Sequence, residues 1–258
     1  MSYRILFLIV LFVFCFGAYA ESKDAPKPKS KPAVDLPHIQ LDREKKTVDI
    51  EGKVCLREGD WLELLACVRG TKEHESIIAV RARASHVHLA LLLVGLEPGK
   101  PQTGRREGEK FIVDPPRGPR VAVSLVYRDK SGKTVEVPAS QWILNRNTGK
   151  PMADNEWLFT GSRFETIRVP VKPGSEKYNE KEVYGADLSG TIMSIVNFGD
   201  DLLSRDTNIH NKNDEAVWQV NTKLVPKIGA DVTIRLRPAP KKKRKPIARK
   251  PVVEKKSE

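Results

Sequence analysis

Alternation of apolar and polar side chains is the main pattern along this chain, and it predicts strands. Residues 120–127 place Val121, Val123 and Leu125 on one face, and residues 231–237 alternate in the same way. A period of two is typical of strands that bury one face. Short apolar or β-branched runs predict further strands at 39–41, 47–50, 54–56, 61–68, 77–80, 134–137, 157–160, 191–198 and 217–220.

Polar clusters between these runs predict the connections. Asp42–Lys46 separates the first two strands, and Lys130–Lys133 precedes the strand at 134–137, so we expect a hairpin at both places. Arg57–Asp60 is a further turn signal between the strands expected at 54–56 and 61–68.

One segment, Ser85–Gly95, departs from the strand pattern. It is apolar nearly all round, with a serine suited to an N-cap at its start and a glycine suited to a helix end. This predicts a helix buried against a sheet, although a central strand also fits a short apolar run. The whole pattern predicts a single α+β domain dominated by strands in antiparallel or mixed sheets, with one buried helix near 85–95.

The first twenty residues have the features of an export signal. Arg4 is followed by the uncharged apolar run Ile5–Phe16, and Ala18-Tyr19-Ala20 supplies the small residues that signal peptidase requires. We expect cleavage after Ala20 and export to the periplasm or the extracellular space. The run is shorter than the roughly 20 residues of a membrane span, so no span is expected in the mature chain.

Composition divides the remainder into three parts. Residues 21–37 hold four prolines and four lysines and predict an extended linker. Residues 38–238 are long enough for one sizeable core and form the expected globular domain. Residues 239–258 are rich in charge, have only Ile247, Val252 and Val253 as large apolar residues, and predict a disordered basic tail.

Most of the net charge of +12 lies in this tail, which has nine basic and two acidic residues. The tail is either a solvated, self-repelling segment or an electrostatic tether to anionic envelope polymers or lipid headgroups. A nucleic-acid partner is not expected behind an export signal. The basic cluster that resembles a nuclear address and would bind anions consists of Lys241, Lys242, Lys243, Arg244 and Lys245.

Several phrases together resemble one family. The most specific is Thr71–Ser76 (TKEHES) beside Leu62–Cys67 (LELLAC), and the chain over Ile39–Pro238 is similar to the YdjY-type domain of exported bacterial proteins. The resemblance implies a location and a domain but no activity, and the basic tail lies outside it. The other matching phrases are Cys55–Gly59 (CLREG), Ala90–Gly99 (ALLLVGLEPG) and Trp157–Ser162 (WLFTGS).

Two cysteines remain after Cys15 is removed with the signal. Cys55 and Cys67 can be a disulfide, buried free thiols or metal ligands. A tight turn at Glu58–Asp60 would offset them by roughly 10–17 Å along the strands, beyond the ~7 Å Cα limit of a disulfide. A disulfide therefore requires a wide loop between them.

The segment Lys72–Glu75 is the best candidate for chemistry. Cys67, His74 and Glu75 lie within nine residues and can bind a transition metal such as zinc or perform acid–base chemistry. The spacing matches no zinc or blue-copper signature, and His74 and Glu75 can equally hold neighbouring strands together by hydrogen bonds. We therefore predict no cofactor, with a transition metal as the alternative.

Other candidates are weaker. His86 and His88 cannot share a metal on a helix, where they lie about 200° apart, and His210 stands in a polar loop. Ser162 lacks the second glycine of a nucleophile elbow, because Phe164 occupies that position. The four tryptophans are expected to close the core: Trp61, Trp142, Trp157 and Trp218.

No catalytic signature stands in the chain. The leading hypothesis is therefore a non-enzymatic binding or interaction domain of the bacterial envelope. The alternative is a metal-binding or redox protein that uses Cys67, His74 and Glu75.

Overall fold

The computed structural model describes residues 35–59, 61–153, 157–206, 217–240 and 252–254. The expected signal, His210 and the basic cluster 241–245 lie outside these ranges. The compact unit begins at Leu36, which packs in the core at 8% exposure. The compact unit therefore starts two residues before residue 38, the expected start of the domain.

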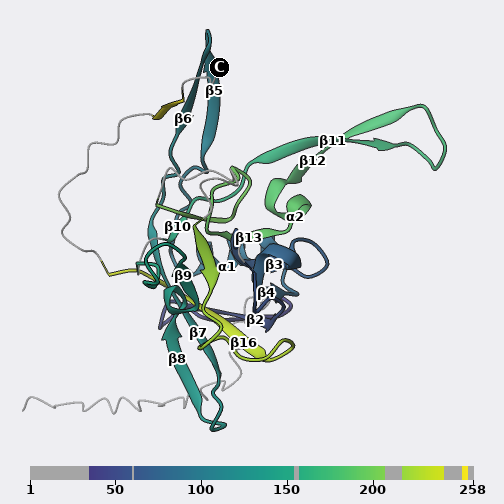
Figure 1. Cartoon of the computed structure of the whole chain (residues 1–258). Helices are drawn as coiled ribbons and strands as arrows, with labels where there is room; N and C mark the ends of the chain where they lie inside the picture. The colour runs from purple at the N-terminus through teal and green to yellow at the C-terminus, as the bar shows by residue number, and fades with distance from the viewer. Residues whose placement is uncertain (1–34, 60, 154–156, 207–216, 241–251, 255–258) are drawn as a thin grey trace, which may run out of the picture. The chain divides into compact units, whose positions relative to one another are not determined.

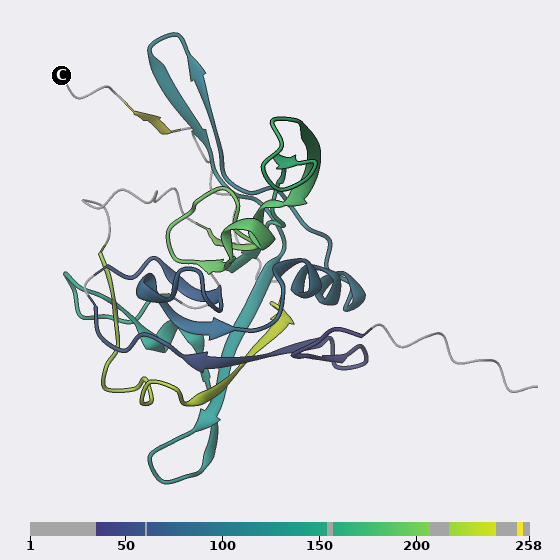
Figure 2. The same ribbon diagram turned by 90° about the vertical axis from the view of Figure 1, so that its right-hand side faces the viewer.

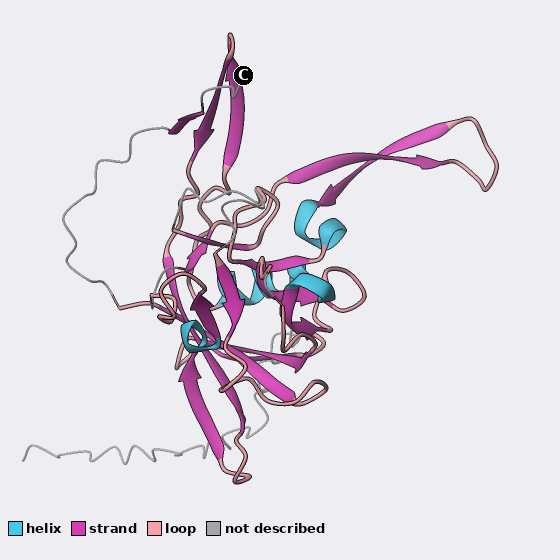
Figure 3. Ribbon diagram, viewed as in Figure 1, coloured by secondary structure: helices cyan, strands magenta, loops and turns pink. Residues whose placement is uncertain are grey.

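The fold is a closed, mixed sheet with strands as the dominant element (Figures 1 and 3). The strands β2 and β4, at the two ends of the spatial order given below, pair with each other and close an eight-stranded barrel. Two of the pairings are parallel and the others are antiparallel. In spatial order the strands are β2 (Thr47–Val54), β16 (Asp231–Pro238), β7 (Arg120–Arg128), β10 (Trp157–Phe159), β14 (Leu203–Arg205), β13 (Thr191–Ser194), β3 (Leu64–Val68) and β4 (Ser76–Val80).

Two hairpins extend the barrel sheet as expected. β1 (Ile39–Asp42) pairs with β2 across the polar turn, and β8 (Thr134–Pro138) pairs with β7. The inward faces of β7 and β16 are those that the alternation predicts, and their side chains form the core with little or no exposure: Val121, Val123, Leu125, Val232, Ile234 and Leu236.

The helix α1 (Ala84–Leu93) confirms the predicted helix and packs on β1 and β2 (Figure 2). Gly95, at φ 86°, takes the left-handed conformation that ends it. Arg83, not Ser85, is the N-cap residue. The burial of α1 is one-sided, since Leu89 and Leu92 are 37% and 41% exposed. None of the helices in the described ranges is long and apolar enough to cross a membrane.

Several elements lie outside the barrel. The short helical turns are η1 (Glu73–Glu75), η2 (Ala139–Trp142) and α2 (Gly185–Ser189). β9 (Ile143–Asn145) pairs with β15 (Trp218–Val220). Two further hairpins, drawn as long ribbons in Figure 3, are β5 (Thr103–Glu107) with β6 (Lys110–Asp114) and β11 (Phe164–Pro170) with β12 (Tyr178–Tyr184).

The tail holds one short strand. β17 (Val252–Glu254) pairs antiparallel with β6, so the segment 239–258 is not irregular throughout. The amide of Ala239 also donates to the backbone oxygen of Arg120 at 2.9 Å, which continues the pairing of β16 with β7.

The predicted strands at 54–56 and 61–68 need correction. β2 runs through Val54, and β3 begins only at Leu64. The two strands are not neighbours, because β4 pairs with β2 on one edge and with β3 on the other. The amide of Cys55 continues this pattern by donating to the backbone oxygen of Ile77 on β4 at 2.9 Å.

Candidate functional site

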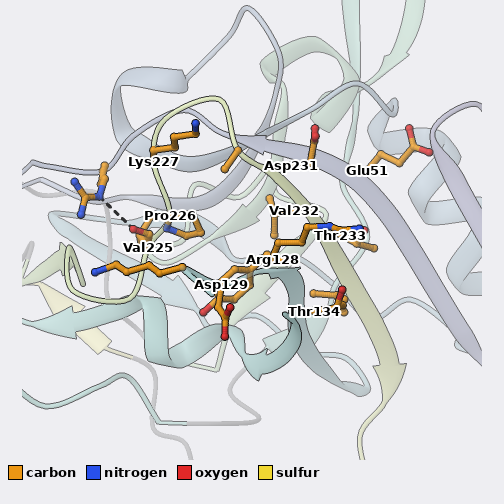
Figure 4. Close-up of a pocket in the computed structure, with 16 residues that line it drawn as sticks. Glu51, Arg128, Asp129, Thr134, Val225, Pro226, Lys227, Asp231, Val232 and Thr233 are labelled. Atoms are coloured by element: carbon orange, nitrogen blue, oxygen red, sulfur yellow. Dashed lines mark hydrogen bonds between the residues drawn. The ribbon is translucent and has the colours of Figure 1, made fainter. Parts of the chain in front are cut away.

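A pocket of about 840 Å³ lies beside the β7–β8 hairpin (Figure 4). The end of β7 and the start of β8 form one wall, and the start of β16 forms another. The loop before β16 closes the pocket. Part of its lining is apolar, contributed by Val126, Tyr127, Val225, Pro226 and Val232.

Four basic side chains line this pocket: Arg57, Arg128, Lys130 and Lys227. We call it the cationic pocket. Within the described part of the chain, none of the four forms an ion pair with a carboxylate. Arg57 uses its guanidinium to donate to the backbone oxygens of Val225 at 3.1 Å and Thr222 at 2.9 Å.

The acidic side chains of the pocket all have partners. Asp129 accepts hydrogen bonds from the hydroxyl and amide of Ser131 and the amide of Lys133, and these bonds lower its pKa. Asp231 pairs with Lys53 at 2.5 Å, and Glu51 contacts His38 at 3.1 Å. Four basic and three acidic side chains line the pocket, and one of the acidic ones, Asp231, is paired with Lys53 from outside the lining. Positive charge is therefore in excess in the pocket, which favours anionic ligands.

The two cysteines form a second feature of interest. Both thiols are free, with Cys67 fully buried and Cys55 half-buried. The Cys55 thiol donates to the backbone oxygen of Ser76 at 3.0 Å. Cys67 lies opposite Ala79 on the other edge of β4.

The two thiols differ in acidity. An interaction with the Cys55 side chain lowers the pKa of Cys67. The Ser76 and Thr71 side chains and the Lys72 backbone act in the same direction. The pKa of Cys55 is raised, first by its interaction with Cys67 and then by burial. Cys67 is therefore the more acidic member of the pair.

The structure does not assemble the predicted set of Cys67, His74 and Glu75. No three His, Cys, Asp or Glu side chains of the described residues are placed to hold a metal. His74 lies in η1, and its side chain is 77% exposed. Its Nε2 atom lies 3.8 Å from a carboxylate oxygen of Glu75.

Burial, followed by the charge of Glu75, raises the pKa of Glu63 to about 7.

The remaining candidates have structural contacts. The Ser162 hydroxyl accepts from the amide of Ala186 at 2.9 Å and donates to the backbone oxygen of Asp200 at 2.6 Å. His88 hydrogen-bonds the hydroxyl of Tyr184 at 2.6 Å. Of the tryptophans, Trp142, Trp157 and Trp218 are buried as expected, whereas Trp61 is 51% exposed and stacks near Arg146.

The fold defines a strand-dominated barrel domain, which by itself implies no activity. The YdjY domain model matches residues 39–237, and the chain therefore belongs to the YdjY domain family. Neither the curated proteins nor the solved structures contain a significant match to this chain.

Proposed function

We propose that this YdjY domain is a non-enzymatic binding domain of the bacterial envelope that holds an anionic ligand in the cationic pocket. One observation carries the proposal. Four basic side chains without a carboxylate partner surround an apolar lining, while the three acidic side chains there are each engaged. A ligand that supplies negative charge completes this arrangement.

The apolar part of the lining indicates what else the ligand has. Tyr127 is half-buried and packs edge-on against the buried ring of Trp142, with ring centroids 5.1 Å apart. A fixed aromatic ring beside Val232, its partner on β16, suits the apolar face of a sugar. An acidic glycan of the envelope, bearing carboxylate or phosphate groups, combines both properties.

Export and the tail extend the same proposal. Cleavage after Ala20 would release the domain where such polymers occur. The basic cluster Lys241–Lys245 would add a second, sequence-independent attachment that weakens with salt. We propose binding rather than catalysis. The carboxylates of the pocket make contacts within a turn or with neighbouring side chains, and its basic side chains have no carboxylate partner among the described residues.

The test is titration of the mature protein with polygalacturonate, using dextran as the neutral polymer. The double variant Arg128→Gln/Lys130→Gln should bind polygalacturonate at least about 10-fold more weakly, since a hydrogen bond to a charged group contributes roughly 1.5–3 kcal/mol. The matched control is Arg106→Gln/Lys110→Gln, which removes the same charge from the exposed β5–β6 hairpin.

The control variant should keep wild-type affinity. Equal losses in both double variants would reduce the binding to net charge and contradict a pocket. Equal affinity for dextran would contradict an anionic ligand.

A further inference from the structure

A second pocket, of about 460 Å³, lies beside α1 and shares no lining residue with the cationic pocket. Four residues of α1 line it: Ser85, His88, Leu89 and Leu92. Because they are spaced by three, four and seven positions, they share one face of the helix. The pocket therefore uses the side of α1 that the core leaves uncovered.

The other walls come from two distant parts of the chain. Pro98 and Pro101 belong to the loop after α1, and Phe164 begins β11. Gly161, between β10 and β11, has φ 65°, and a Cβ there would lie 3.0 Å from Pro98 Cβ and 3.2 Å from His88 Cε1. A glycine at this position lets the two walls approach each other.

The pocket is uncharged and largely apolar. None of its lining residues is Lys, Arg, Asp or Glu. Three of its apolar side chains are exposed, namely Leu89, Leu92 and, at 68%, Phe164. A single exposed apolar side chain is ordinary, but three around one cavity indicate a binding site. A charged ligand would lose hydration there without gaining a partner, so the lining favours an uncharged one.

Aromatic rings continue from the wall into the barrel. The Phe164 and Tyr184 rings meet edge to face, with centroids 5.6 Å apart. The His88 ring meets Tyr184 in the same way at 5.5 Å and Phe159 at 5.0 Å. A ring placed in the pocket would extend this edge-to-face packing, which is the arrangement that aromatic rings prefer. We call the cavity the aromatic pocket.

The hydrogen bonds around Tyr184 fix the proton of His88. The Ser162 amide donates to the Tyr184 hydroxyl at 2.8 Å. This hydroxyl lies 2.6 Å from His88 Nδ1, which is the acceptor for its own proton within the described part of the chain. Burial lowers the pKa of His88, so the ring is neutral and its proton is on Nε2.

The Nε2–H group of His88 is available to a ligand. Among the described residues it has no hydrogen-bond partner, and it is not buried. The Thr160 and Ser162 hydroxyls, in contrast, already donate to the backbone oxygens of Leu202 and Asp200. The aromatic pocket thus offers a fixed donor on an apolar wall.

We propose that the aromatic pocket binds a small, uncharged aromatic molecule whose carbonyl or hydroxyl oxygen accepts a hydrogen bond from His88 Nε2. The cavity volume lies within the roughly 300–1,000 Å³ of small-molecule sites. This site is independent of the cationic pocket, which favours ligands of the opposite kind.

The test is NMR titration of the mature protein with benzamide, an uncharged ring with a carbonyl group, and with benzoate, which has the same ring and a charge. We expect saturable benzamide shifts at Leu92 and Phe164, and affinity for benzoate at least about 10-fold lower. Phe164→Ala should weaken benzamide binding about 5–10-fold. The matched control, Tyr178→Ala, removes a 56% exposed ring elsewhere on the same hairpin and should bind like wild type.

A second variant tests the donor. His88→Phe keeps a ring but removes Nε2–H, and it should weaken benzamide binding about 5-fold. Circular dichroism reports whether each variant is folded. In wild type, long-range ¹H–¹⁵N spectra should place the imidazole proton on Nε2.

Four results would overturn the inference. The first is an imidazole proton on Nδ1, and the second is the absence of saturable benzamide shifts at Leu92 and Phe164. The third is an equal loss of affinity in folded Phe164→Ala and Tyr178→Ala, or equal binding of benzoate at these residues. The fourth is tighter binding of N-acetylphenylalanine amide than of benzamide, which would assign the pocket to an aromatic side chain of a peptide.

Discussion

Arg57 Nε donates a hydrogen bond to the backbone oxygen of Val225 at 3.1 Å, a contact drawn as a dashed line in Figure 4. The residues are 168 positions apart in the chain. Together with the bond to Thr222, this contact ties the loop before β16 to the segment after β2. Arg57 therefore both fixes the loop that closes the cationic pocket and contributes one of the positive charges of the pocket.

Arg57→Ala should lower the free energy of unfolding by about 1–2 kcal/mol, because it removes a charged donor from two backbone oxygens. Urea denaturation measures this change. The control, Arg106→Ala, removes an exposed arginine of the β5–β6 hairpin and should change stability by less than about 0.5 kcal/mol. Equal effects of the two substitutions would show that the loop does not depend on Arg57.

Asp201 gives the fold a pH dependence. Burial raises its pKa to about 6, against about 3.9 for an unfolded chain, although Ser204 and the amide of Phe198 donate to it. The native state thus binds this proton more tightly than the unfolded state. The resulting stabilisation is complete below about pH 4 and is lost as the pH rises through about 6.

Comparing the pH dependence of stability in wild type and in Asp201→Asn separates the contribution of Asp201 from that of other titrating groups, such as Glu63. The unfolding free energy of wild type, relative to the variant, should fall by up to about 3 kcal/mol between pH 4 and pH 7. Urea unfolding at several pH values measures it. Parallel pH curves for the two proteins would contradict the assignment.

Glu136 acts in the opposite direction. Hydrogen bonds from Arg237, then from Ser124 and Arg235, lower its pKa to about 2. The contribution is present above about pH 4.5 and is lost as the pH falls toward 2. Because the side chain is 35% exposed, Glu136→Gln should cost only about 0.5–1 kcal/mol at pH 7. The control is Glu97→Gln, at an exposed loop position. An equal loss of unfolding free energy in both variants would contradict a stabilising role for the contacts of Glu136 with Arg235 and Arg237.

The tail should contribute little to global stability. Removing residues 241–258 leaves the bond between Ala239 and Arg120 intact and deletes only the three-residue strand β17. We expect the melting temperature to change by less than about 2 °C. Hydrogen exchange should lose protection only along β6, the partner of β17. Faster exchange in the barrel strands would show that the tail supports the core.

Local patterns predicted much of the fold. Alternation in β7 and β16 follows from burial of one face, and Gly95 ends α1 because it adopts a left-handed conformation. The β5–β6 hairpin was missed, since the strand Thr103–Glu107 is exposed along its whole length and buries no apolar face. Closure of the barrel depends on pairing β2 with β4, which no local signal encodes.

The sites were harder to predict for the same reason. Arg57, Arg128 and Lys227 come from three distant segments that meet only when the barrel closes. The sequence marks the two cysteines as candidates, but their relative position depends on β4 lying between them. His74 was favoured because it is near Cys67 in sequence, whereas η1 leaves its side chain in solvent.

The most direct test of the central claim is chemical-shift mapping of the mature protein by NMR with a short oligogalacturonate. The account predicts that the largest shifts cluster at Arg128, Lys130 and Lys227 and at the apolar lining around Tyr127, and that they persist when residues 241–258 are removed. Shifts confined to the tail, or scattered over basic residues such as Arg106 and Lys110, would contradict a binding site in the cationic pocket.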